Sequence, residues 1–474
     1  MIPTGIRRPL WPGVLALALL AAAPLPARAY TGLPVVSPTE DTHVQYTRRA
    51  RYAVPADDLY KSPVQLRISP DGRRLYVACE GTDEVLVADT RRRAVVDAIP
   101  VGPMPFDMLL SPGGDSLYVT HRWGNAIGVV DLRRSALVDS LRSGDDPHDL
   151  ALSPDRCFLF VANLGTNDLS VIERATGVEV KRLPVGVAPF GLAVSPDGRS
   201  VYVSSQYSLP VPFRTPSVLE LTVVDVEKQL VRERRQLFST VVGQGVAATL
   251  DGHFAVTAVE LPKNLIPETQ VYQGWMVTYG LAFTESRPGG RTAYLLIDEP
   301  NLYFADPYDL ALSPDGRWLY VTSSAADAVT VVDLEKAYRV MQVSEGRIGL
   351  SDEQIATCAR HLALSNDYVA ARIPTGANPK GLAISPDGRW LYVAERLEDR
   401  VLVIDARSQR ADGYIDLGGP REETVLRRGA KLFSYASISF QKQMSCATCH
   451  PENSVDGLLY DIAVDGGMGR NLVD

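Results

Sequence analysis

Cysteine, histidine and basic charge are scarce in this chain. Its 474 residues include only five cysteines and six histidines, and 56 acidic residues outnumber 48 basic ones, giving a net charge of −8. Five cysteines are too few for a fold held together mainly by disulfides, and an odd number leaves at least one thiol for another use. No basic run occurs beyond the extreme N-terminus, which argues against a nucleic-acid partner.

Long apolar runs are also missing after the N-terminus, so no further membrane-spanning helix is expected. What the chain has in abundance is turn formers, with 37 glycines and 33 prolines spread along its length. Together with 46% hydrophobic residues, this composition indicates a sizeable core built from short strands, and it disfavours an all-helical fold.

Residues 1–29 have the pattern of an export signal. Arg7 and Arg8 precede an apolar stretch over residues 11–25, and Ala27-Arg28-Ala29 has the small-x-small form of a cleavage site. A retained membrane anchor is the alternative, but the apolar stretch is short and interrupted by prolines. We therefore expect a signal peptide at residues 1–29, an N-terminal extension at residues 30–62, and a periplasmic or extracellular product without a transmembrane anchor.

The strongest architectural signal is a turn motif that recurs every 42 residues. Its first four copies are Ser69-Pro70-Asp71-Gly72, Ser111-Pro112, Ser153-Pro154-Asp155 and Ser195-Pro196-Asp197-Gly198. Further copies begin at Thr249, Ser313 and Ser385, where insertions stretch the spacing to 54, 64 and 72 residues. Each copy is flanked by four short strand patterns, which is typical of a propeller blade. The sequence therefore predicts a mainly β fold with a seven-bladed β-propeller over residues 63–419; an open solenoid is the alternative.

The strand after each turn carries a recognisable signature. Leu75-Tyr76-Val77-Ala78, Leu117-Tyr118-Val119-Thr120 and Leu391-Tyr392-Val393-Ala394 resemble the repeats of the bacterial YVTN family of propellers. The resemblance supports the fold, but it implies little about activity, because such propellers serve as scaffolds, binding platforms and enzyme shells. Long insertions at about residues 206–218, 262–300 and 335–375 are expected to be loops that make contacts.

One position in the repeat is expected to line the mouth of the channel. It lies five residues before each turn motif and is occupied by Val64, Phe106, His148, Phe190, Gln244, Tyr308 and Lys380. The next position supplies Asp107, Asp149 and Asp309. These residues suggest a ligand site, with Phe106, His148, Phe190, Tyr308 and Lys380 as candidates. The alternative is that they satisfy neighbouring backbone groups and plug the channel.

The residues after the propeller carry a motif for covalent haem attachment. A near-helical apolar pattern begins near Glu422, and Cys446-Ala447-Thr448-Cys449-His450 follows as a C-x-x-C-H. One helical turn presents both thiols to the haem vinyl groups, and the histidine is then placed to ligate the iron. A zinc half-site and a thioredoxin-like dithiol are rival interpretations, but no second ligand pair and no βαβ context accompany the motif. We expect a short α-helical cytochrome c-type domain over residues 420–474 with one covalent haem c.

Two further observations concern this domain. Met468 is the only downstream side chain suited to be the second axial ligand of the iron, with a tail role as the alternative. The segments 428–433, 445–451, 455–457 and 469–471 resemble the start of the di-haem cytochrome c peroxidase and MauG-type family. That resemblance implies that His450 is the proximal ligand, that Cys446 and Cys449 form the thioethers, and that a second haem motif should follow. This sequence contains no second motif and no histidine after His450.

Three functions agree with these patterns. The first is an exported c-type cytochrome that transfers electrons and uses its propeller to dock a redox partner protein. The second is part of a peroxidase-type oxidoreductase that needs a partner subunit or a continuation. The third is a propeller binding module with a vestigial haem tail. The sequence predicts neither the oligomeric state nor the electron donor and acceptor.

Overall fold

The computed structural model describes residues 59–211, 215–262, 276–451, 459–462 and 467–472. The predicted signal peptide and most of the N-terminal extension lie outside the described residues. Ala56–Asp474 form one compact unit, so the segment that follows the propeller packs on it. No helix among the described residues has the length and apolarity needed to cross a membrane.

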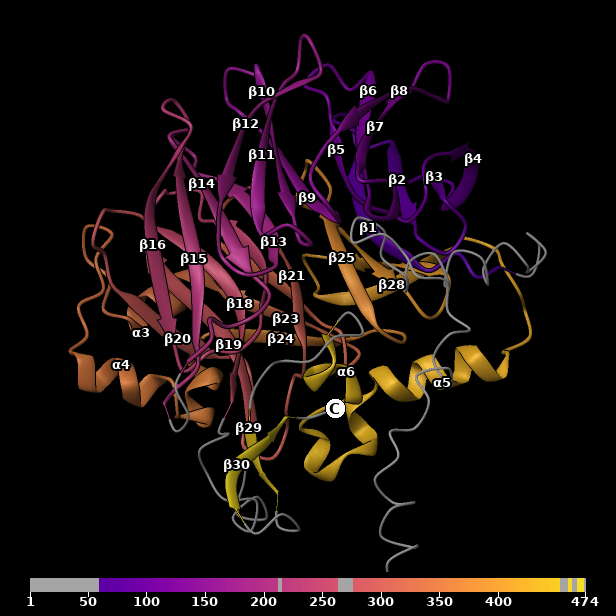
Figure 1. The fold of residues 1–474 in the computed structure, drawn as a ribbon. Helices are drawn as coiled ribbons and strands as arrows, with labels where there is room; N and C mark the ends of the chain where they lie inside the picture. The colour runs from indigo at the N-terminus through magenta and orange to yellow at the C-terminus, as the bar shows by residue number, and fades with distance from the viewer. Residues whose placement is uncertain (1–58, 212–214, 263–275, 452–458, 463–466, 473–474) are drawn as a thin grey trace, which may run out of the picture. The chain divides into compact units, whose positions relative to one another are not determined.

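Seven four-stranded antiparallel sheets confirm the predicted propeller, each built from four consecutive strands (Figure 1). The first four blades are β1 (Pro63–Ile68), β2 (Arg74–Cys79), β3 (Glu84–Asp89) and β4 (Ala94–Pro100); β5 (Pro105–Leu110), β6 (Ser116–His121), β7 (Ala126–Asp131) and β8 (Ala136–Arg142); β9 (Pro147–Leu152), β10 (Phe158–Asn163), β11 (Asp168–Glu173) and β12 (Val178–Pro184); β13 (Pro189–Val194), β14 (Ser200–Ser205), β15 (Val218–Asp225) and β16 (Leu230–Phe238).

The last three blades contain the insertions. They are β17 (Gly243–Ala248), β18 (Phe254–Pro262), β19 (Val277–Glu285) and β20 (Thr292–Leu296); β21 (Pro307–Leu312), β22 (Trp318–Ser323), β23 (Ala328–Asp333) and β24 (Val369–Pro374); β25 (Pro379–Ile384), β26 (Trp390–Glu395), β27 (Arg400–Asp405) and β28 (Arg410–Asp416). The prediction of a loop over residues 262–300 was wrong in part, because β19 and β20 belong to blade five. Every residue of β19 is buried, so the strand lacks the alternation that marks a half-exposed strand.

The insertion in blade six contains short helices. It comprises α3 (Leu334–Val340), α4 (Asp352–Cys358) and the 3-10 helix η5 (Leu362–Asp367). The Ser351 hydroxyl accepts the Gln354 N–H, and the Gln354 side chain accepts the Ser351 N–H, so a capping box starts α4. These helices cover blades five and six and enlarge the apolar cluster around Phe254, Phe283 and Tyr368.

The recurring turn motif has one physical cause in every blade. In the first copy the Ser69 hydroxyl donates to the Asp71 carboxylate at 2.6 Å and accepts the Arg74 N–H at 2.9 Å. Gly72 adopts φ of +70°, a left-handed conformation that glycine tolerates at little cost. The same hydroxyl-to-carboxylate bond recurs at Thr249, Ser313 and Ser385. The motif therefore fixes the hairpin between the first two strands of each blade.

The innermost strands are joined to one another by the carboxylates expected at the mouth. Asp107 on β5 accepts the Leu150 N–H of the next blade at 3.3 Å, and Asp149 accepts the Leu192 N–H at 2.6 Å. Asp309 accepts the Leu382 N–H at 2.9 Å in the same way. Burial raises the pKa of Asp149 and of Asp309. These carboxylates satisfy backbone groups between blades, as the structural alternative predicted.

The ring closes between blades one and seven, where β1 lies beside β25 (Figure 1) and also contacts β26. Neither blade borrows a strand from the other, so side chains hold this seam. Asp399 of blade seven accepts the Ser62 N–H at 2.9 Å, and Arg427 donates to Asp399 at 2.6 Å and to the Ser62 hydroxyl at 3.0 Å. Arg427 and Asp399 are both buried. Arg427 belongs to α5 (Val425–Ser434), so the C-terminal segment clasps the seam.

Replacement of Arg427 should therefore weaken the whole propeller. We expect Arg427→Ala to lower the free energy of unfolding by about 3 kcal/mol, because it leaves Asp399 buried without its partner charge. Urea unfolding followed by intrinsic fluorescence measures this. Arg428→Ala, on the exposed side of the same helix, is the matched control and should change stability by less than about 0.5 kcal/mol. Equal stabilities of the two variants would contradict the claim that Arg427 holds blades one and seven together.

His121 at the end of β6 is a structural histidine. Its ring is buried, and Nε2 accepts the Gly102 N–H at 3.0 Å. A Cβ on Gly102 or Gly128 would come within 2.4 Å of the ring, so both glycines make room for it. Burial lowers the pKa of His121 to about 4, and the ring is therefore neutral near pH 7.

This lowered pKa predicts a pH-dependent stability. The unfolded chain binds the proton near pH 6.5 and the folded chain only near pH 4, so stability is full above pH 6.5 and falls as the pH drops toward 4. We expect His121 to account for a loss of up to about 3 kcal/mol over this range. Measured against pH, the unfolding free energy of His121→Gln should lack this part of the decline. Parallel curves for both proteins would refute this explanation.

Candidate functional site

The cysteine motif forms one helical turn, and a capping box stabilises its N-terminus. Helix α6 spans Cys446–Cys449, and Ser445 and Thr448 make a reciprocal capping box at its start. The His450 N–H donates to the Cys446 carbonyl at 3.0 Å and so continues the turn. The local sequence therefore places both thiols and the histidine on one short, ordered element.

Asp306 fastens this element to the propeller. Its carboxylate accepts the Thr448 hydroxyl at 2.6 Å and the Ser445 hydroxyl at 3.0 Å. Asp306 occupies the residue before β21 with φ of +56°, a conformation that Asp and Asn tolerate better than most side chains. Burial raises the pKa of Asp306, while the two hydroxyl bonds and Lys380 lower it. Charge-assisted hydrogen bonds of this kind are among the stronger ones in proteins.

Further contacts hold the residues on either side of the motif. The Tyr279 hydroxyl donates to the Gln443 carbonyl at 2.6 Å, and the Gln443 side chain accepts the Met276 N–H at 2.8 Å. Beyond the motif, the Tyr207 hydroxyl donates to the Pro451 carbonyl at 3.0 Å. The 3-10 helices η6 (Ala436–Ile438) and η7 (Phe440–Lys442) connect α5 to this region. The motif is thus attached to blades four, five and six.

The two thiols differ in their surroundings. Cys446 is exposed, and Cys449 is partly exposed and packs on Val241 and Val242. None of the five cysteines forms a disulfide, so the sulfurs of Cys446 and Cys449 are not used in one. Met468 belongs to β30 (Gly467–Leu472), which pairs with β29 (Leu459–Ile462), but its side chain lies outside what the structure describes. Its role as an iron ligand stays a prediction.

The structure brings together the residues expected at the mouth. The Phe106 and His148 rings lie 3.9 Å apart, the His148 and Phe190 rings 4.0 Å, and the Phe190 and Tyr308 rings 5.4 Å. Lys380 places its ammonium 3.6 Å from the centre of the Tyr308 ring. His148 Nδ1 lies 2.9 Å from the Phe190 carbonyl oxygen. These side chains pack on one another and fill the channel below the mouth.

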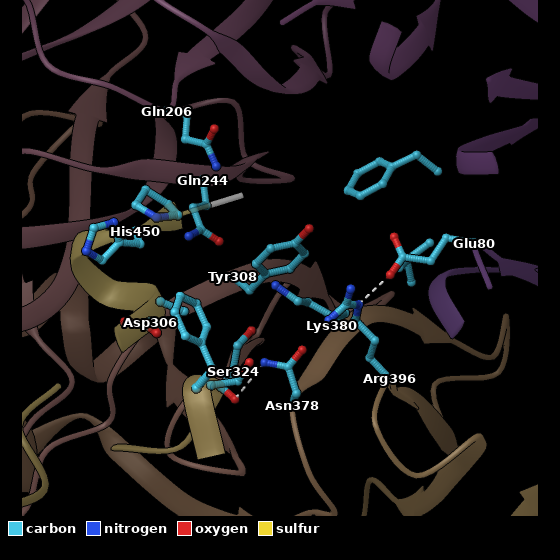
Figure 2. A pocket seen from close by; sticks show the side chains of 16 residues that line it. Glu80, Gln206, Gln244, Asp306, Tyr308, Ser324, Asn378, Lys380, Arg396 and His450 are labelled. Atoms are coloured by element: carbon cyan, nitrogen blue, oxygen red, sulfur yellow. Dashed lines mark hydrogen bonds and ion pairs between the residues drawn. The ribbon is translucent and has the colours of Figure 1, made fainter. Parts of the chain in front are cut away.

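A cavity of about 100 Å³ lies between this aromatic plug and the cysteine motif (Figure 2). The propeller contributes polar side chains from several blades, and the motif contributes Ala447, His450 and Pro451. The labelled polar residues in Figure 2 are Glu80, Gln206, Gln244, Asp306, Tyr308, Ser324, Asn378, Lys380, Arg396 and His450. The cysteine motif closes one side of this space, which we call the mouth cavity.

Sequence reasoning found only part of this lining. Gln206, Ser324 and Arg396 lie eleven residues after the start of each turn motif, and Asp306 and Asn378 lie seven before it. The repeat thus sends three positions to the mouth rather than one, and only the middle one was considered. At the other two positions the residue type differs from blade to blade, and this variability was the sequence signal that could have identified them.

The comparisons with known proteins agree with the propeller. A family model described as "Lactonase, 7-bladed beta-propeller" matches residues 66–178. The chain is similar to hydrazine synthase subunit beta of Kuenenia stuttgartiensis. The two are 30% identical over 181 residues, which are 38% of this chain and 45% of that protein, so the match spans less than half of the relative. A solved structure of Kuenenia stuttgartiensis hydrazine synthase matches with a TM-score of 0.67 and 27% identity, covering 73% of this chain and 96% of that one.

The residues present suit a covalently bound haem. Such a haem needs two reactive thiols on one turn and one imidazole, and Cys446, Cys449 and His450 supply these groups without a competing disulfide. The described residues contain no cluster of three or more histidine, cysteine or carboxylate side chains placed to hold a bare metal ion. The mouth cavity is far smaller than sites for drug-sized ligands, so it is not the space for a porphyrin.

The attachment of α6 to Asp306 can be tested directly. Asp306→Asn keeps the shape and the backbone preference of the residue but removes the charge that the two hydroxyls contact. We expect amide exchange at Thr448 and His450 to accelerate by about 10- to 100-fold, corresponding to about 1.5–3 kcal/mol. Hydrogen exchange followed by mass spectrometry measures this. Asp97→Asn, on the exposed strand β4, is the control, and unchanged exchange in Asp306→Asn would contradict the attachment.

Proposed function

We propose that this protein is an exported c-type cytochrome in which one haem, attached through Cys446 and Cys449 and ligated by His450, passes single electrons to or from a partner protein docked on the propeller. The observation that carries the proposal is the ordered turn of α6, whose two cysteines are not joined in a disulfide and are followed directly by a histidine. The haem would supply the redox chemistry. The chain's own residues attach it, ligate it and hold its position relative to the propeller.

The rigid mounting of the motif supports electron transfer. Transfer between proteins requires a cofactor held in a fixed position near the surface, and sites on rigid elements keep such positions best. Asp306, Gln443 and Pro451 tie the motif to three blades, while Cys446 remains exposed. Attachment of the haem in the periplasm agrees with the export pattern of residues 1–29.

A partner protein is supported by the relatives. The similar protein from Kuenenia stuttgartiensis is named as a subunit, so it belongs to a larger assembly. The peroxidase-type alternative requires an open coordination position on the iron and a contribution from a further segment or subunit. The binding-module alternative draws support from the mouth cavity, which exists whether or not a haem is attached.

Haem attachment is tested by producing the protein in a host that matures c-type cytochromes. We expect the intact mass to increase by one haem and the pyridine haemochrome spectrum to have the c-type position. Cys446→Ala with Cys449→Ala should abolish the added mass, because both thioethers are lost. Cys157→Ala, which removes an exposed cysteine of blade three, is the control and should leave attachment unchanged. A colourless protein of unmodified mass would end the cytochrome proposal and favour the binding module.

The spectrum of the oxidised protein separates the first two functions. A low-spin ferric spectrum indicates two axial ligands and favours electron transfer, whereas a high-spin spectrum indicates an open position and favours the oxidoreductase. His450→Ala should keep the thioethers but change the spectrum, since it removes the proximal ligand without touching the thiols.

A further inference from the structure

The mouth cavity presents buried hydrogen-bonding groups that no described residue satisfies. Gln206 is fully buried, and neither its side-chain oxygen nor its nitrogen has a partner among the described residues. The same holds for Oε1 of Gln244 and Oδ1 of Asn378, whose side chains are at least nine-tenths buried. Buried amide groups in native proteins are almost always paired with protein, water or ligand. Three carboxamides from three blades therefore line one small cavity, and each has at least one hydrogen-bonding atom without a partner among the described residues.

The charged residues of the wall balance one another. Arg396 donates to the Glu80 carboxylate at 2.5 Å, which pairs one cation with one anion (Figure 2). Lys380 is the second cation, and its charge acts on Asp306, the second anion. With two charges of each sign, the wall has no net charge with which to attract an ion strongly. An uncharged ligand suits this balance better than a carboxylate or an ammonium ion.

The unpaired atoms and the volume together define the ligand further. Three of the four unpaired atoms are amide oxygens, which accept hydrogen bonds, and the fourth is the Gln206 nitrogen, which donates. A matching ligand carries several N–H or O–H donors and one acceptor. A volume of about 100 Å³ admits only a few non-hydrogen atoms.

From these observations we propose that the mouth cavity is a binding site for a small uncharged molecule of the primary amide type, rich in N–H or O–H donors. One of its N–H groups donates to the Gln206 oxygen and the other is shared between the oxygens of Gln244 and Asn378, while its carbonyl oxygen accepts from the Gln206 amide. The site lies beside His450 but uses none of the haem-attaching atoms, so it goes beyond the proposed electron transfer and does not depend on haem.

Acetamide is a suitable probe, because it has two N–H donors, one carbonyl and a methyl group that reports binding in saturation-transfer NMR. A ligand of this size binds no tighter than the tens of micromolar, so we expect a saturable signal with a dissociation constant of about 0.1–10 mM. Gln244→Leu should weaken acetamide binding at least tenfold, since it replaces a carboxamide with an apolar group of similar volume. Gln236→Leu, on the exposed strand β16, is the matched control and should bind like the parent protein.

Acetate has nearly the shape of acetamide but carries a negative charge and no N–H donor. We expect it to bind at least tenfold more weakly. Acetate binding as tight as acetamide, an unchanged constant in Gln244→Leu, or no saturable signal at 100 mM would each overturn the proposal, the last indicating that ordered water fills the cavity. Gln206→Leu repeats the test from another blade if Gln244→Leu fails to fold.

The failure of this proposal is distinguishable from the failure of the cytochrome proposal. The titration is performed on the protein without haem and on the haem-loaded protein. Acetamide binding by haem-free protein supports the cavity even if no haem can be attached, and c-type spectra without acetamide binding support only the cytochrome.

Discussion

The buried triad of Ser62, Asp399 and Arg427 is the constraint on which the rest of the molecule depends. Each blade consists of four consecutive strands, so no strand among the described residues crosses the junction between the first and last blades. An unclosed ring would expose both the apolar face and the inner edge of the first and last blades. Arg427 contacts both sides of the junction at once, and it comes from the segment after the last blade. The same side chain thus stabilises both the closure of the ring and the docking of the C-terminal segment.

This coupling has a consequence for the cysteine motif. The C-terminal segment is attached at two places. Arg427, near its beginning, contacts blades one and seven, and the cysteine motif contacts Asp306 of blade six. A loose tail could not hold two thiols and an imidazole at a constant place on the propeller. The buried carboxylate with two hydroxyl donors does so at a moderate cost, because each of its oxygens has a partner and the nearby Lys380 stabilises its charge.

The fold could be predicted from the sequence because its signals are local and repeated. The hydroxyl, the carboxylate and the left-handed residue of each turn, a glycine in every copy except at Arg156, lie within five residues, so the same turn forms in every copy. The mouth was predicted less completely. Phe106, Tyr308 and Lys380 share the predicted strand position and line the mouth cavity, whereas His148 and Phe190 at the same position do not. Gln206 and Asn378 reach the cavity from a strand end and from the residue before a strand. Their meeting depends on closure of the ring, which no local pattern encodes. The strand β19 was missed because burial on both faces removes alternation.

The polar lining of the mouth cavity lowers the stability of the fold. Apolar side chains of similar volume at Gln206 and Gln244 would avoid the desolvation of unpaired amide groups, and the aromatic plug beneath them shows that this part of the channel accommodates apolar packing. A covalently attached haem does not need these groups either, because its attachment uses thiols and an imidazole on the other element. The amides therefore serve something that enters the cavity, and the balanced charges of Arg396, Glu80, Lys380 and Asp306 restrict that occupant to a molecule without net charge.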